Sequence, residues 1–141
     1  DKMKMLNANT VTPEDKILVG TVFDGLFQSL NNRDENGLMN SFSPLIAKFL
    51  GKANATRSDV VTFMHKIYKS DVASMNWMSL EDYAITKKEV GDQQYEYTVV
   101  FSGLQKVEHT DNSSSETRFR FNAKVNPDGR ITELNMTKIL E

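Results

Sequence analysis

Apolar and polar residues alternate with a period of two in the last quarter of the chain, which is typical of a β-strand with one buried face. The buried positions of this strand are predicted to be Phe119, Phe121, Ala123 and Val125. Residues 126–129 (Asn-Pro-Asp-Gly) favour a turn, and residues 130–140 form a second β-rich arm. The pattern therefore predicts a closing β-hairpin.

The first half of the chain follows the 3.6-residue period of helices instead. Thr12 is a capping residue, Pro13 suits the first helical position, and Asp15 stands where the acid of a capping box reaches back. Residues 31–34 end this helix. Its predicted inward face consists of Ile17, Leu18, Val22, Phe23, Leu26, Phe27 and Leu30.

Shorter elements follow the first helix. A short helix is predicted before Pro44, then a brief strand over residues 45–50, and a third helix from the cap at Thr56 to about Lys69. The inward residues of the short helix are Leu38, Met39 and Phe42, and those of the third helix are Val60, Val61, Met64, Ile67 and Tyr68.

From Ala73 onward the pattern is that of strands. Their apolar positions are Met75, Trp77, Tyr83, Ile85, Tyr95, Tyr97, Val99 and Phe101. Helices first and strands afterwards predict an α+β fold, an antiparallel sheet with its helices gathered on one face. Residues 12–141 are interpreted as one domain, and residues 1–11 as a loosely held, flexible tail.

The charge balance gives no reason to expect a nucleic-acid partner. The 141 residues carry 17 basic and 19 acidic side chains, a formal charge of -2, whereas nucleic-acid binding needs a concentrated basic surface. Arg118, Arg120 and Lys124 form a one-sided basic row, which nearby glutamates would largely neutralise. No apolar run approaches the roughly 20 residues of a membrane span, so we predict none.

The sequence contains no cysteine and two histidines that lie far apart, His65 and His109, so we predict neither a metal site nor a thiol nucleophile. No nucleotide-binding or catalytic-triad motif is present, and no cofactor is predicted. The chain begins with Asp1. This start, the lack of cysteine and the many Lys and Asn residues favour an exported bacterial protein, periplasmic or extracellular.

Several segments resemble one known superfamily when they are taken in order. These are residues 26–34 (Leu-Phe-Gln-Ser-Leu-Asn-Asn-Arg-Asp), 37–38 (Gly-Leu), 42–44 (Phe-Ser-Pro) and 128–134 (Asp-Gly-Arg-Ile-Thr-Glu-Leu). Over about residues 12–141 the chain resembles nuclear-transport-factor-two-like (NTF2-like) domains, which include SnoaL-like and ketosteroid-isomerase-like proteins. The resemblance implies a cone-shaped α+β roll, whose strongly curved sheet wraps helices around a pocket, and a homodimer formed through the sheet.

Ketosteroid isomerases of this superfamily carry a carboxylate just after the first strand and a tyrosine on the first helix. Residues 49–52 (Phe-Leu-Gly-Lys) contain no carboxylate, and the position of the tyrosine falls near Leu26 or Phe27. The isomerase chemistry therefore does not transfer to this chain.

Two titratable residues remain candidates for catalysis. His65 on the third helix could act as a general base, as histidines do in some cyclases of this superfamily, and Asp24 on the first helix could pair with it. The alternative interpretation places His65 on the shoulder of its helix, partly exposed, and Asp24 at the surface.

An aromatic set is predicted to line the pocket: Trp77, Tyr83, Tyr97, Phe101 and Phe119, together with Met136. Such a lining is compatible with a flat hydrophobic ligand, although aromatic residues at this spacing also fill cores. We interpret the chain as a non-catalytic domain that binds a small molecule or a protein partner. The alternative is a cofactor-free isomerase, cyclase or dehydratase that acts on a small hydrophobic substrate, with His65 or Asp24 as the base.

Overall fold

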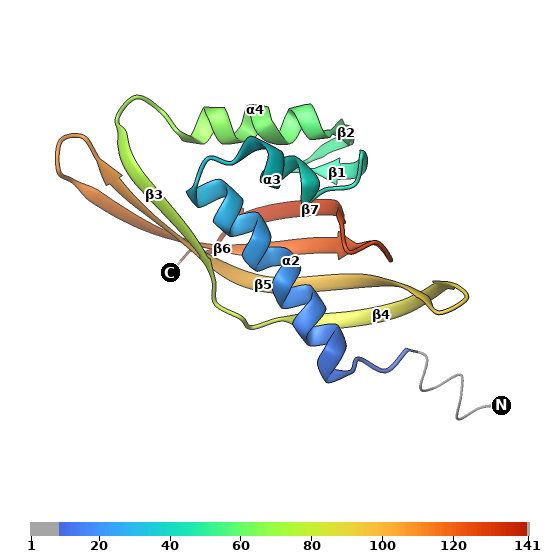
Figure 1. Ribbon diagram of the computed structural model, residues 1–141. Helices are drawn as coiled ribbons and strands as arrows, with labels where there is room; N and C mark the ends of the chain where they lie inside the picture. Colours follow the sequence, from blue (N-terminus) through green and yellow to red (C-terminus); the bar gives the residue numbers. More distant parts are fainter. Residues whose placement is uncertain (1–8, 141) are drawn as a thin grey trace.

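The computed structural model describes residues 9–140, which form three helices on the concave face of a curved seven-stranded sheet (Figure 1). Labels follow Figure 1. In chain order the elements are α2 (Pro13–Asn31), α3 (Glu35–Asn40), β1 (Leu45–Phe49), β2 (Lys52–Thr56), α4 (Arg57–Ile67), β3 (Val72–Ser79), β4 (Ala84–Gly91), β5 (Gln94–His109), β6 (Ser114–Val125) and β7 (Ile131–Lys138). The predicted α+β architecture, with the helices gathered on one face of the sheet, is confirmed.

The strands follow the order β2-β1-β7-β6-β5-β3, and every pair is antiparallel except β1 with β7. β5 has 16 residues and carries two partners along one edge. β4 pairs with its first half and β3 with its second half. The sheet therefore spreads and curls at this end, as in a cone.

The centre of the sheet follows the period-two pattern. Val99 and Phe101 of β5 lie opposite Ala123 and Phe121 of β6, and all four are buried. The predicted hairpin between β6 and β7 is present. Its turn is closed by a hydrogen bond from the backbone of residue 126 to the carbonyl of residue 130, and Gly129 has a φ of 76°.

Helix α2 begins as predicted, and its inward face differs from the prediction only at the start, since Phe23, Leu26, Phe27 and Leu30 are buried. The capping box is present, because the Thr12 side chain accepts from the backbone of Asp15 and the Asp15 carboxylate accepts from the backbone of Thr12. Ile17 and Leu18, predicted to lie inward, are 69% and 38% exposed. At 3.6 residues per turn, Ile17 lies about 200° around the helix from the buried Val19, so that prediction was wrong.

Other boundaries also differ from the prediction. The edge strand β2 was not predicted, because most of its side chains are exposed and it shows no apolar alternation. Helix α4 ends at Ile67, two residues before the predicted Lys69. Residues 1–8 of the predicted tail lie outside the described residues. Within residues 9–140, no helix is long and apolar enough to cross a membrane.

Candidate functional site

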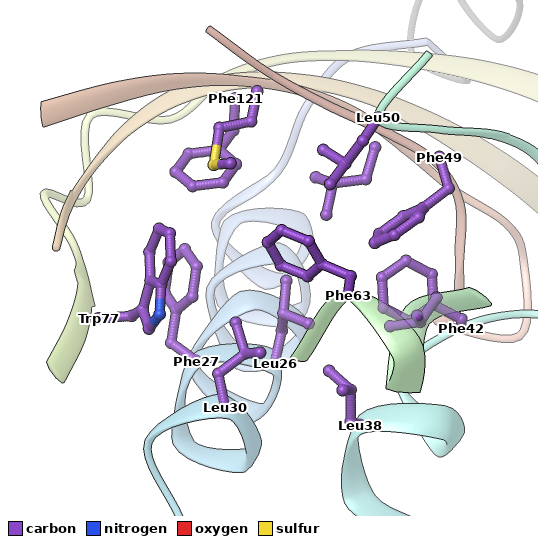
Figure 2. Close-up of a pocket in the computed structure, with 13 residues that line it drawn as sticks. Leu26, Phe27, Leu30, Leu38, Phe42, Phe49, Leu50, Phe63, Trp77 and Phe121 are labelled. Carbon is purple, nitrogen blue, oxygen red and sulfur yellow. The ribbon is translucent and has the colours of Figure 1, made fainter. Parts of the chain in front are cut away.

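An apolar cavity lies where the C-terminal half of α2 meets α3, α4 and the concave face of the sheet (Figure 2). The side chains that line it are Leu26, Phe27, Leu30, Leu38, Phe42, Phe49, Leu50, Val60, Phe63, Trp77, Phe121, Leu134 and Met136. Among these thirteen residues none carries a titratable group. The cavity therefore contains no proton donor or acceptor for acid–base chemistry.

Helix and strand geometry direct these side chains toward one point. Leu26 and Leu30 are four residues apart on α2, so they lie on the same face one turn apart. Asn31 fixes the strand that carries Trp77. Its amide donates to the carbonyl of Trp77 (2.9 Å) and accepts from the Trp77 N–H (2.6 Å). The indole consequently stacks on Phe27, with the ring centroids 6.2 Å apart.

The void at the centre of this lining is small and dry. About 20 Å³ is open to the centre of a water-sized molecule, against the roughly 10–15 Å³ that one water needs on the same measure. A buried water also needs about two to four polar partners, and this lining offers none. The void favours hydrocarbon over water.

The predicted lining residues are divided between the cavity and the core. Trp77 and Met136 line the cavity, whereas the other four belong to neighbouring packing layers. Phe101 lies between Phe23 and Phe121, with ring centroids 4.5 and 5.0 Å away. Tyr83, Tyr97 and Phe119 contact Phe101, Asp15 and Trp77 respectively.

The two candidate catalytic residues lie at separate surface positions. His65 is exposed, and its Nε2 lies 3.0 Å from Oε1 of Glu35. Asp24 is also exposed. It lines a surface hollow between α2 and β3, beside Asn76 and Ser79. Neither side chain lines the apolar cavity, and the structure does not bring the two together.

A buried polar cluster that the sequence did not reveal lies at the opposite end of α2. We call it the Asp15 cluster: Asp15, Lys87, Tyr97 and the backbone of Thr12. Oδ1 of Asp15 accepts from the Tyr97 hydroxyl at 2.5 Å, and Oδ2 accepts from Lys87 Nζ at 2.9 Å and from the Thr12 N–H at 2.8 Å. The side chains of Asp15 and Lys87 are only 10% and 8% exposed.

These contacts shift two pKa values in opposite directions. Burial acts to raise the pKa of Asp15, but the hydrogen bonds from Tyr97, Thr12 and Lys87 outweigh it and lower that pKa to about 2. Burial and the adjacent carboxylate raise the pKa of Tyr97. Asp15 is therefore an ionised, fully coordinated carboxylate near neutral pH, and it lies outside the cavity.

The residues between 9 and 140 contain no group of three or more His, Cys, Asp or Glu side chains that could hold a metal ion.

No protein-family model and no curated protein matches the sequence.

Solved structures match the fold. An NTF2-like superfamily protein from Salmonella enterica superposes with a TM-score of 0.71 at 12% identity, covering 89% of this chain and 92% of that one. A hexachlorocyclohexane dehydrochlorinase, LinA-type3, from Novosphingobium barchaimii gives 0.70 at 9% identity, covering 90% and 88%. ActVI-ORFA from Streptomyces coelicolor gives 0.65 at 14%, covering 86% and 95%. The chain therefore has the NTF2-like fold that its resemblance implied.

Proposed function

We propose that this chain is a non-catalytic binding domain whose cavity takes a small, uncharged, largely hydrocarbon molecule. The observation that carries the proposal is the cavity lining, which consists of thirteen apolar side chains around a small void. An apolar ligand would bury its surface against hydrocarbon there. A charged ligand would lose its hydration and find no partner, which is costly.

The single tryptophan makes this proposal directly testable, because Trp77 lines the cavity. Titration with toluene, followed by Trp77 fluorescence and calorimetry, is expected to give saturable binding with a Kd on the order of 1 mM and a negative heat-capacity change. Benzoate, which has the same ring with a carboxylate in place of the methyl group, is the matched control and is expected not to bind. Equal binding of both compounds, or of neither, contradicts the proposal.

The alternative remains a cofactor-free enzyme of the isomerase, cyclase or dehydratase type. Its support is that two structural neighbours are named as dehydrochlorinases. His65 and Asp24 would have to reach a substrate from outside the cavity lining. Turnover of a small hydrophobic substrate that disappears in a His65→Ala or Asp24→Ala variant would favour this alternative.

We also propose a homodimer formed through the convex face of the sheet, which none of the helices between residues 9 and 140 covers (Figure 1). Met78 of β3 pairs with Leu104 of β5, and Val100 lies four residues before Leu104 on the same face. These residues form a small apolar strip among charged side chains, which suits a modest interface. Sedimentation equilibrium is expected to show a dimer that Leu104→Glu dissociates and Leu45→Glu, at an exposed position on β1, does not. A wild-type monomer at all concentrations contradicts this proposal.

A further inference from the structure

Leu50 has a backbone conformation that is unusual for its residue type. With Gly51 it forms the two-residue turn between β1 and β2, and their φ angles are 48° and 89°. Turns of this kind favour Asn-Gly, because both residues need a positive φ. Of the six non-glycine residues with positive φ between residues 9 and 140, Leu50 is the only apolar one. The turn alone therefore does not explain a leucine at this position.

The leucine side chain has a role in the cavity instead. Figure 2 shows Leu50 projecting into the cavity beside Phe49 and Phe63. Leu50, Phe63 and Met136 are half-buried, whereas the other ten lining residues are buried. These three residues therefore mark the side on which the cavity approaches solvent, and Leu50 covers it from the turn.

The turn is attached to the rest of the sheet by few bonds. β2 is an edge strand, and β1 pairs with β7 at two positions. The Leu50 N–H donates to the Leu134 carbonyl (2.9 Å), and the Gly51 N–H donates to Oδ1 of Asn135 (3.1 Å). Elements with few such bonds at an edge open locally at low cost, and left-handed residues often occur where strain is used in function.

From this geometry we propose that Leu50 is a displaceable plug. The β1–β2 turn holds its side chain in the cavity, and an uncharged hydrocarbon ligand the size of one aromatic ring binds by taking its place as the turn moves. The void alone is little larger than one water molecule. An aromatic ring therefore fits only if a lining side chain moves out of the cavity. This inference rests on the proposed function, and it adds that Leu50 limits the size of the ligand.

The first test compares toluene binding to the wild type, Leu50→Ala and Leu45→Ala. Leu45 lies on β1, the strand that leads into this turn, but is 81% exposed, so it is the matched control. Leu50→Ala is expected to lower the Kd for toluene on the order of tenfold, because the ligand no longer has to displace the apolar carbons of the leucine. Leu45→Ala is expected to leave the Kd unchanged.

The second test uses the wild-type protein, so it does not depend on the folding of a variant. In an amide NMR titration with toluene, the Gly51 signal is expected to shift because its hydrogen bond to Asn135 changes as the turn moves. Gly129 lies in the other glycine turn with positive φ, away from the cavity lining, and its signal is expected to stay in place.

The outcomes separate the plug from the function on which it rests. If toluene binds the wild type, but binds Leu50→Ala no more tightly and leaves the Gly51 signal in place, the plug is overturned and the binding domain remains. Absence of binding to every variant overturns both. Tighter binding to Leu50→Ala, together with a Gly51 shift in the wild type, supports the plug.

Discussion

The two ends of helix α2 bury different kinds of side chain against the sheet. At the N-terminal end, the Asp15 cluster joins the helix to β4 and β5 through one ion pair and directional hydrogen bonds. At the C-terminal end, the side chains of Leu26, Phe27 and Leu30 line an apolar cavity, and Asn31 holds the helix to β3 by two hydrogen bonds to the Trp77 backbone. The directional bonds of the Asp15 cluster allow one geometry, whereas the apolar side chains at the C-terminal end can repack.

This difference indicates which end is suited to binding. A buried carboxylate with a shifted pKa is the usual first suspect for a functional site. Here the bonds that lower the pKa of Asp15 engage both of its oxygens with protein groups, so the carboxylate anchors the helix. The cavity lining has no polar side chain that is fixed by an ion pair, so its apolar side chains can repack around a ligand.

The largest expected effect comes from removing the anchor. Asp15→Ala leaves the Lys87 ammonium buried without its partner and the Tyr97 hydroxyl without its acceptor, and should lower the free energy of unfolding by about 3–5 kcal/mol. Asp59→Ala is the matched control, since Asp59 holds the same capping-box position on α4 with an exposed lysine partner. Urea unfolding followed by Trp77 fluorescence measures both variants. Equal losses would show that Asp15 acts only as a helix cap.

A change at the apolar end should destabilise the protein but improve binding. Leu38 is fully buried and lines the cavity, so Leu38→Ala should cost about 2–4 kcal/mol while enlarging the void. Toluene should then bind more tightly and recover part of the lost stability, as measured by unfolding with and without ligand. Asp15→Ala leaves the cavity lining unchanged, so toluene should stabilise this variant no more than it stabilises the wild type. A Leu38→Ala protein that toluene does not stabilise would contradict the comparison.

The contribution of the N-terminal end of α2 to the free energy of unfolding should also depend on pH. The pKa of Asp15 is about 2 in the folded protein against an ordinary 3.8, so at acid pH the unfolded chain takes up this proton first. The stability that Asp15 contributes, about 2 kcal/mol, is complete well above pH 4 and is lost as the pH falls toward 2. The difference in unfolding free energy between the wild type and Asp15→Asn should therefore shrink over this window. A difference that stays constant from pH 6 to 2 would contradict the low pKa.

Much of the fold could be predicted because its signals are local. The alternation in β6, the turn at residues 126–129 and the caps at Thr12 and Thr56 each depend on neighbouring residues, and all are present in the structure. The edge strand β2 lacks such a signal because solvent surrounds most of its side chains.

The site was less predictable because it forms between distant elements. Phe63 and Leu50 come from a helix and a turn, and nothing in their local pattern shows that they meet Trp77 of β3. The one available signal was the leucine before Gly51, since a two-residue turn favours asparagine there. The Asp15 cluster joins residues more than 70 positions apart, so its acid was interpreted only as a cap.

The inward line of α2 begins with an acid rather than an apolar residue, and this explains the error in its predicted face. Asp15, Val19 and Phe23 follow one another at four-residue steps and are all buried. An acid does not show this line in the pattern of apolar residues, and the predicted face therefore begins at Ile17 and Leu18. Ile17→Ser should therefore change stability by less than about 0.5 kcal/mol, whereas Val19→Ser at the fully buried position should be far more costly. Urea midpoints of the two variants measure this, and a substantial loss for Ile17→Ser would mean that another surface covers this part of α2.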